Sequence, residues 1–255
     1  MKKIALVFLL LLSGCATPNL HDFNRTPPVI DTVVYKPLLE LAPPERVATV
    51  AVYDFPDLTG QRKASSTGAD FSTAVTQGGT PLLISALKNA GNGTWFRVVE
   101  RNRIDDLTKE RQIVRQTREE YQGEGANKLE PMVFAGLILQ GGVIGYDTNI
   151  VTGGAGARYL GIGATTQYRR DQVTVSLRAV STNTGEVIMN VQVSKTILST
   201  GTDFSLFKFM DVGTKLLETE VGMTENEANT VAVKMTIEAA VVELINQGKT
   251  KGYWR

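Results

Sequence analysis

A stretch of strict alternation, from Tyr159 to Thr165, places the strongest constraint on the fold of this chain. Leu160, Ile162 and Ala164 occupy every second position, and the residues between them are glycines that follow a tyrosine and precede a threonine. A period of two indicates a β-strand, because successive side chains of a strand point to opposite faces of its sheet. One face is larger and apolar and the other is small or hydroxylated, a division that suits a wall between lipid and water. We therefore expect this segment to enter a membrane as part of a β-hairpin.

Residues 193–210 form a second candidate membrane segment. Alternation at its start is followed by the turn signal Gly201-Thr202-Asp203 and by an aromatic-rich run that contains Leu206, Phe207 and Phe209. Together with residues 150–168, this segment predicts two long hairpins whose bases belong to a compact domain.

The remaining segments predict that compact domain. Apolar runs predict strands at residues 46–55, 95–101 and 137–146, and the segments 80–88 and 103–120 between them predict helices. Helices that alternate with strands are typical of an α/β domain in which helices cover a sheet.

Local signals predict three helix starts. Thr80 and Pro81 are expected to be the N-cap and the first residue of one helix. A short helical start is expected around Pro131. The last helix is expected to begin at the capping-box residues Thr224 to Glu227.

The N-terminal residues predict a lipoprotein of the bacterial envelope. A basic start and the apolar run from Ile4 to Leu12 lead directly into Leu-Ser-Gly-Cys, which ends at Cys15. The run is too short to span a bilayer as a helix, so residues 1–14 are expected to be a signal peptide. Cys15 resembles the acylated first residue of bacterial lipoproteins, which carries N-acyl and S-diacylglycerol groups. The alternative is an ordinary secretory signal with an incidental cysteine.

The proline-rich residues 15–45 are expected to be a tether from this lipid anchor. Ala16 rather than an aspartate follows the cysteine, which in lipoprotein families favours the outer membrane. No later segment is apolar over the length that a transmembrane helix needs. If the body of the protein enters a bilayer, it must do so as closed β-structure.

Composition and motifs argue against several other functions. The net charge is +1, which gives no reason to expect nucleic acid as a partner. The only histidine, His21, lies in the proline-rich tether and the only cysteine is Cys15, so neither a catalytic triad nor a thiolate metal site is expected. No glycine-rich phosphate loop occurs. We expect no enzymatic activity, no metal and no cofactor other than the covalent lipid.

Hairpins in a membrane would require several copies of the chain. Four strands leave two edges whose unpaired amide and carbonyl groups are costly in hydrocarbon. A head-to-tail ring of identical subunits closes such a wall. The predicted fold class is therefore α+β, in which a compact α/β domain contributes two β-hairpins to an oligomeric transmembrane β-barrel. That domain consists of residues 46–149, 169–192 and 211–255.

Motifs along nearly the whole mature chain resemble the CsgG family of curli secretion-channel lipoproteins. They include the lipobox at Cys15, Phe71 to Val75, Gly156 to Tyr168, Ser194 to Ser199 and Leu216 to Gly222. The resemblance implies a nonameric ring in the outer membrane, with its α/β domains in the periplasm. It implies that unfolded curlin subunits pass through the ring to the cell surface, and that periplasmic and surface curli accessory proteins are partners.

The long polar loop of residues 56–71 has a single aromatic at its end, Phe71, and a ring would repeat it around the axis as a constriction. The resemblance also places a pore constriction in this loop. Phe71 matches the family's phenylalanine, Asp70 stands where the family has asparagine, and Ser66 stands near the position of a family tyrosine. A ring of Asp70 carboxylates would favour cations. The expected function is passive, constriction-gated diffusion of the substrate. A structural envelope lipoprotein without a pore and a periplasmic ligand-binding domain are the alternatives.

Overall fold

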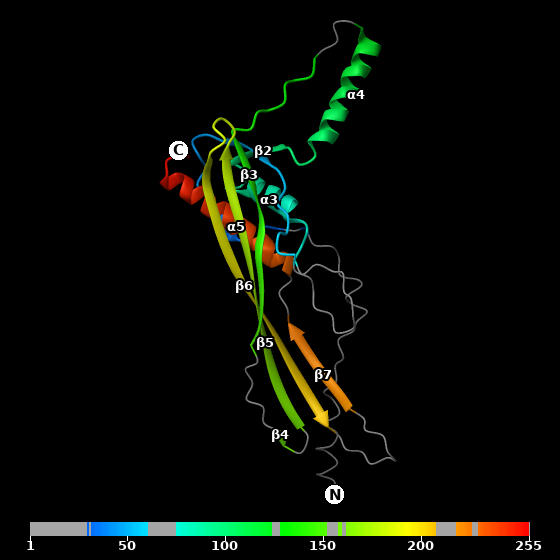
Figure 1. Ribbon diagram of the computed structural model, residues 1–255, viewed down its shortest axis with the longest axis vertical. Helices are drawn as coiled ribbons and strands as arrows, with labels where there is room; N and C mark the ends of the chain where they lie inside the picture. The colour runs from blue at the N-terminus through cyan, green and yellow to red at the C-terminus, as the bar shows by residue number, and fades with distance from the viewer. Residues whose placement is uncertain are drawn as a thin grey trace, which may run out of the picture. The chain divides into compact units, whose positions relative to one another are not determined.

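The computed structural model describes residue 30 and residues 32–60, 75–123, 128–151, 158–159, 162–207, 218–225 and 229–254 (Figure 1). The chain divides into two units, Met1–Thr32 and Val33–Arg255. The second unit contains the described helices and strands, which form a mixed α/β domain.

One mixed sheet runs through this unit. Its described strands are β1 (Ala48–Val52), β2 (Phe96–Glu100), β3 (Leu137–Val151), β4 (Arg158–Tyr159), β5 (Ile162–Ser181), β6 (Val187–Phe207) and β7 (Glu218–Glu225). Their order in this seven-stranded sheet is β2-β1-β3-β5-β6-β7, with β4 paired to β5. β1 lies parallel to β2 and β3, and the other neighbours are antiparallel.

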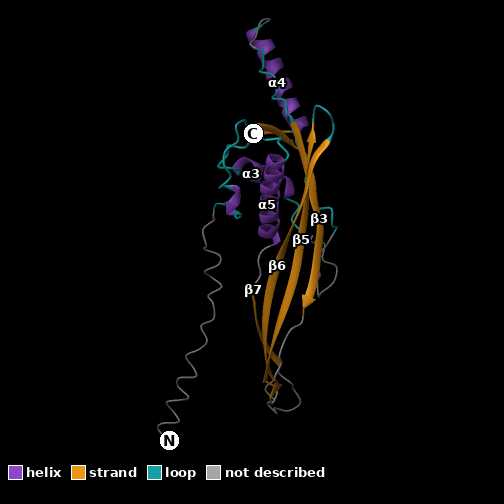
Figure 2. Cartoon of the chain, turned by 90° about the vertical axis from the view of Figure 1, so that its left-hand side faces the viewer, coloured by secondary structure: helices purple, strands orange, loops and turns teal. Residues whose placement is uncertain are grey.

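Helices cover part of one face of this sheet. The described helices are the 3-10 turn η1 (Lys36–Leu38), α3 (Gly79–Asn89), α4 (Ile104–Gln122) and α5 (Asn229–Thr250). Figure 2 shows α3 and α5 on the same side of the sheet, where α5 packs against β5 and β6. The core contains fully buried aliphatic side chains from strands and helices, among them Val50, Leu139, Leu177, Ile237 and Leu244.

The predicted alternation of strands and helices is confirmed. β1, α3, β2, α4 and β3 follow one another in the expected order, and each overlaps the segment predicted for it. Within these strands, Val50 to Val52 of β1 and Leu139 and Val143 of β3 are buried in the core.

The local helix signals were less reliable than the hydrophobic patterns. α3 begins at Gly79, and the Thr80 hydroxyl accepts a hydrogen bond from the backbone N–H of Phe55 at 2.9 Å instead of capping the helix. No helix forms at Pro131, because residues 128–135 lack regular secondary structure. The capping box was also wrong: Thr224 and Glu225 belong to β7 and pair with β6, and tertiary pairing overrides the local preference.

β5 and β6 are long enough to leave the helix-covered region. Every residue of β5 from Ile162 to Val180 has a partner in β6, beginning with Leu206 and ending with Val187. The pairing has one register shift. Figure 1 shows both strands continuing past α5, with β4 and β7 beside their far ends. We call this part the extended ladder, which comprises β4, β7, residues 149–151 of β3, residues 162–170 of β5 and residues 198–207 of β6.

Candidate functional site

The extended ladder is amphipathic by its register. Residues that pair across antiparallel strands share a face of the sheet, so the pairing sorts the sequence into two rows. The apolar pairs are Ile162 with Leu206 and Ala164 with Phe204. The pairs that alternate with them are Gly163 with Ser205, Thr165 with Asp203 and Gln167 with Gly201. The sheet therefore aligns apolar residues with one another and polar or small residues with one another.

β7 extends both rows by one strand. In the apolar row, its residues Val221 and Met223 pair with Phe204 and Thr202. In the polar row, Glu220 and Gly222 pair with Ser205 and Asp203. The division is less strict in the rest of the described ladder, where Thr202 and Glu225 share the apolar row and Phe207 pairs with Glu218 in the polar row. The two-sided character is clearest from Ile162 to Thr165 of β5, and β7 continues it at Val221.

The junction between the covered domain and the extended ladder contains a buried polar pair. The Tyr146 hydroxyl of β3 donates a hydrogen bond to Asp171 Oδ2 of β5 at 3.0 Å, and both side chains are buried. Just before it, the pairing of β3 shifts by one residue between Val143 and Gly145. Such a bulge typically bends a strand and increases its local twist.

The loop predicted to form a constriction has a well-defined stem at this same junction. The backbone N–H of Val143 donates to the Pro56 carbonyl at 3.0 Å, and the N–H of Leu58 donates to the Val143 carbonyl at 2.9 Å. On the returning side, Gln77 Nε2 donates to Asp57 Oδ2 at 3.3 Å. Asp57 Oδ1 also accepts hydrogen bonds from Thr59, at 2.9 Å from its N–H and 2.6 Å from its hydroxyl. Both ends of the loop are therefore held beside β3.

A glycine makes this stem possible. A Cβ atom at Gly142 would lie 2.5 Å from the Pro56 carbonyl oxygen, which is closer than such atoms approach. Any other residue there would displace the loop from β3. Sequence reasoning missed the stem residues Asp57, Gln77 and Gly142, although the Gly141-Gly142 pair within a strand is a signal for close approach of another backbone.

The described residues include only part of the predicted site. Tyr159 lies in β4, Ile162 and Ala164 lie in β5, and Leu206 and Phe207 lie in β6. Register brings Ile162 opposite both Tyr159 and Leu206. The remaining predicted residues lie outside the described residues; they are Cys15, Ser66, Asp70, Phe71, Leu160 and Phe209.

Two other kinds of site are absent from the described part of the chain. There, no three His, Cys, Asp or Glu side chains come together as candidate metal ligands. Among the described helices, none combines the length and the apolar character needed to cross a bilayer.

The sequence shows the family to which this α/β domain with its extended ladder belongs. Residues 32–255 match the family model described as "Curli production assembly/transport component CsgG". The chain is a member of the CsgG family, as the sequence motifs indicated.

Two relatives, from Escherichia coli and Salmonella typhimurium, agree with the family match. The curli production assembly/transport component CsgG of Escherichia coli strain K12 is 40% identical over 251 residues, which cover 98% of this chain and 89% of that protein. The protein of the same description from Salmonella typhimurium strain LT2 is 40% identical over 255 residues, covering 99% and 90%. A crystal structure of a lipoprotein from Neisseria meningitidis matches 78% of this chain and 99% of that chain, with a TM-score of 0.29 and 15% identity.

Proposed function

We propose that this protein is the outer-membrane channel through which unfolded curli subunits leave the periplasm. Family membership supports the broader statement, that the chain is a component of curli production and transport. One observation carries the more specific proposal: the extended ladder continues past the helices with an apolar row and a polar row in register. That is the arrangement of a β-wall with lipid on one side and water on the other.

The edges of the extended ladder explain why the channel would be a ring. β7 lies at one edge, and at the other edge lie β4 and residues 149–151 of β3, whose only partner among the described strands is β5. Unpaired backbone groups are too costly in hydrocarbon, so each edge requires a strand from another copy. A head-to-tail contact between β7 of one subunit and β3 of the next would close the wall.

The gate would be the loop that the stem holds beside β3. In a ring, the stem at Asp57 and Gln77 would recur around the axis and bring one Phe71 from each subunit toward the centre. Asp70 and Ser66 would lie in the same constriction. Substrate would pass by diffusion, with direction given by its capture outside the cell.

The lipid anchor would keep this ring at the outer membrane. Acylation of Cys15 with N-acyl and S-diacylglycerol groups, joined through the tether of residues 15–45, would hold the chain on the bilayer almost without exchange. The α/β domain would then lie in the periplasm. The partners would be other copies of the chain, outer-membrane lipid, curlin subunits and curli accessory proteins.

A matched pair of arginine substitutions tests the proposal. Ile162→Arg places a charge in the apolar row, where an arginine facing lipid costs about 2–4 kcal/mol at mid-bilayer and less toward either interface. Gln167→Arg places the same charge in the polar row of the same strand. In a strain that lacks its own channel, we expect Ile162→Arg to abolish heat-resistant oligomers and curlin export, and Gln167→Arg to retain both.

Two results would contradict the channel. One is equal export by the two variants, which would mean that the rows do not face lipid and water. The other is an intact ring that exports no curlin, which would favour a structural scaffold.

A further inference from the structure

Helix α4 and the segment that follows it enclose a basic groove. No residue of α4 is buried, although the helix is long. The groove has a volume of about 450 Å³ and lies between α4 and residues 128–132. α4 contributes Arg111, Arg115 and Arg118, which lie at helical spacing on one face. A groove of this kind is suited to a ligand from another molecule, because neither the sheet nor the extended ladder contributes to its lining.

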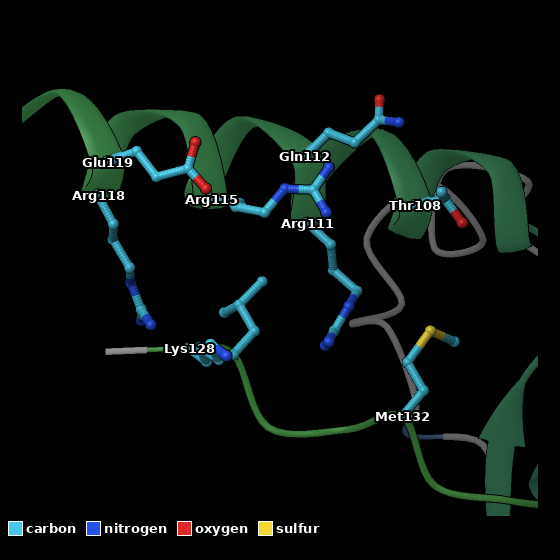
Figure 3. A pocket seen from close by; sticks show the side chains of 9 residues that line it. Thr108, Arg111, Gln112, Arg115, Arg118, Glu119, Lys128 and Met132 are labelled. Atoms are coloured by element: carbon cyan, nitrogen blue, oxygen red, sulfur yellow. The ribbon is translucent and has the colours of Figure 1, made fainter. Parts of the chain in front are cut away.

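The opposite wall of the groove is partly apolar. It consists of Lys128, Leu129 and Met132. Figure 3 shows the Arg111 and Arg118 side chains extending from the helix toward this wall, with Lys128 between them. Glu119 is the one carboxylate among the lining residues.

One arginine links the two walls. Arg111 Nη2 donates a hydrogen bond to the Glu130 carbonyl at 2.7 Å, which fixes the segment against the helix. Beyond the groove, the apolar surface continues along the same segment with Val133, 44% exposed, and Phe134, 74% exposed. The site therefore combines a row of fixed cations with adjacent exposed apolar surface.

From this combination we infer that the groove binds an acidic peptide segment of a second protein, one that alternates carboxylate and apolar side chains. Carboxylates would pair with Arg111, Arg115 and Lys128, and arginine is suited to this because its guanidinium holds a carboxylate through two hydrogen bonds. Apolar side chains of the peptide would lie on Leu129 and Met132. A small inorganic anion would use the cations and leave the apolar wall exposed to water.

A second copy of α4 fits the groove less well. The helix carries five carboxylates, Asp105, Asp106, Glu110, Glu119 and Glu120, but Lys109 and its three arginines offset four of those charges. Arg103 Nε also lies 3.5 Å from Asp106 Oδ2 in an ion pair. The helix therefore offers little acidic surface for another basic groove. The inference concerns α4 alone and holds whether or not the extended ladder forms a channel.

The test uses the full-length protein in detergent and a short fluorescein-labelled peptide of alternating glutamate and leucine. We expect saturable binding, measured by fluorescence anisotropy, that weakens as salt is raised. Arg115→Glu should weaken binding by about tenfold or more, since it replaces a charge-assisted hydrogen bond with repulsion. Arg115→Gln, which only removes the charge, should have a smaller effect in the same direction.

Lys109→Glu is the matched control, because Lys109 lies on the same helix outside the groove lining. It should leave the affinity nearly unchanged, and circular dichroism should show that every variant folds. Equal losses for Arg115→Glu and Lys109→Glu would overturn the inference, as would no binding or equal binding of a lysine-leucine peptide. Self-association that Arg115→Glu abolishes, without peptide binding, would identify a second copy as the occupant and also overturn it.

Discussion

The two halves of the β5–β6 ladder have the same periodicity but different surroundings. In the covered half, Val173, Val175 and Leu177 alternate with half-buried polar residues, and all three are completely buried. α5 packs on this part of the sheet. In the extended ladder, Ile162 and Ala164 alternate in the same way, yet Figure 1 shows the strands running beyond the helix. A period of two identifies a two-faced strand, and the neighbouring elements determine whether its apolar face meets protein or another medium.

The largest expected difference between the halves is in folding stability. Leu177→Ala removes a fully buried side chain and leaves a cavity under α5, so it should lower the free energy of unfolding by about 2–5 kcal/mol. Ile162→Ala in the extended ladder should lower it by less than about 1 kcal/mol, because none of the described helices covers that part of the strand. Urea unfolding of the unassembled chain, followed by tryptophan fluorescence, measures both. Equal losses would contradict the distinction between the halves.

The junction pair should have an intermediate effect. Tyr146→Phe removes the donor to Asp171 in a buried setting, which typically costs about 1–3 kcal/mol. The exposed hydroxyl pair of Thr174 and Ser194, 2.8 Å apart, provides the control, and Thr174→Val should change the stability by about 0.5 kcal/mol or less. The same unfolding measurement applies. A larger loss for Thr174→Val than for Tyr146→Phe would show that the junction is not held by this bond.

Elements defined by burial of apolar side chains in the core could be predicted from the sequence. Elements defined by pairing with a distant strand could not. The apolar runs of β1 and β3 identified buried strands, because only a covered sheet makes such runs favourable. Thr224 and Glu225 have the local chemistry of a helix start, but pairing with β6 places them in β7. A motif of a few residues carries no information about which distant strand will pair with it.

The stem of the constriction loop shows the same limit of prediction from sequence. Asp57 and Gln77 meet only because the chain returns to the same part of β3, and their spacing in the sequence carries no recognised motif. Phe71 was predicted as the single aromatic of the loop and matched by family resemblance, whereas Asp70 and Ser66 were identified through that resemblance alone; the role of all three remains a prediction. Ile162 and Leu206 were expected in separate membrane segments, and the register adds that they pair with each other.

Loosening the stem should affect the loop and leave the covered domain intact. Asp57→Ala removes the acceptor of the Gln77 and Thr59 hydrogen bonds, so trypsin should cleave after Arg62 or Lys63 a few times faster. Asp54→Ala, the same change at an exposed acid before the stem, should leave the rate unchanged. The fragments can be identified by mass spectrometry. Equal rates for both variants would show that Asp57 does not hold the loop.

The smallest expected effect concerns ion preference at the proposed constriction. If Asp70 carboxylates ring the pore, Asp70→Asn should lower the ratio of cation to anion permeability, on the order of twofold. Reversal potentials in a salt gradient across a planar bilayer measure this ratio. An unchanged ratio would show that Asp70 does not line the constriction. It would not contradict the proposal that the protein is a channel.

Conductance of the purified full-length protein in planar bilayers tests the central claim most directly. The account predicts discrete steps of one size from heat-resistant oligomers, and larger steps for Phe71→Ala because one aromatic per subunit is removed from the narrowest point. Oligomers that insert into the bilayer and pass no current would contradict a channel formed by the extended ladder.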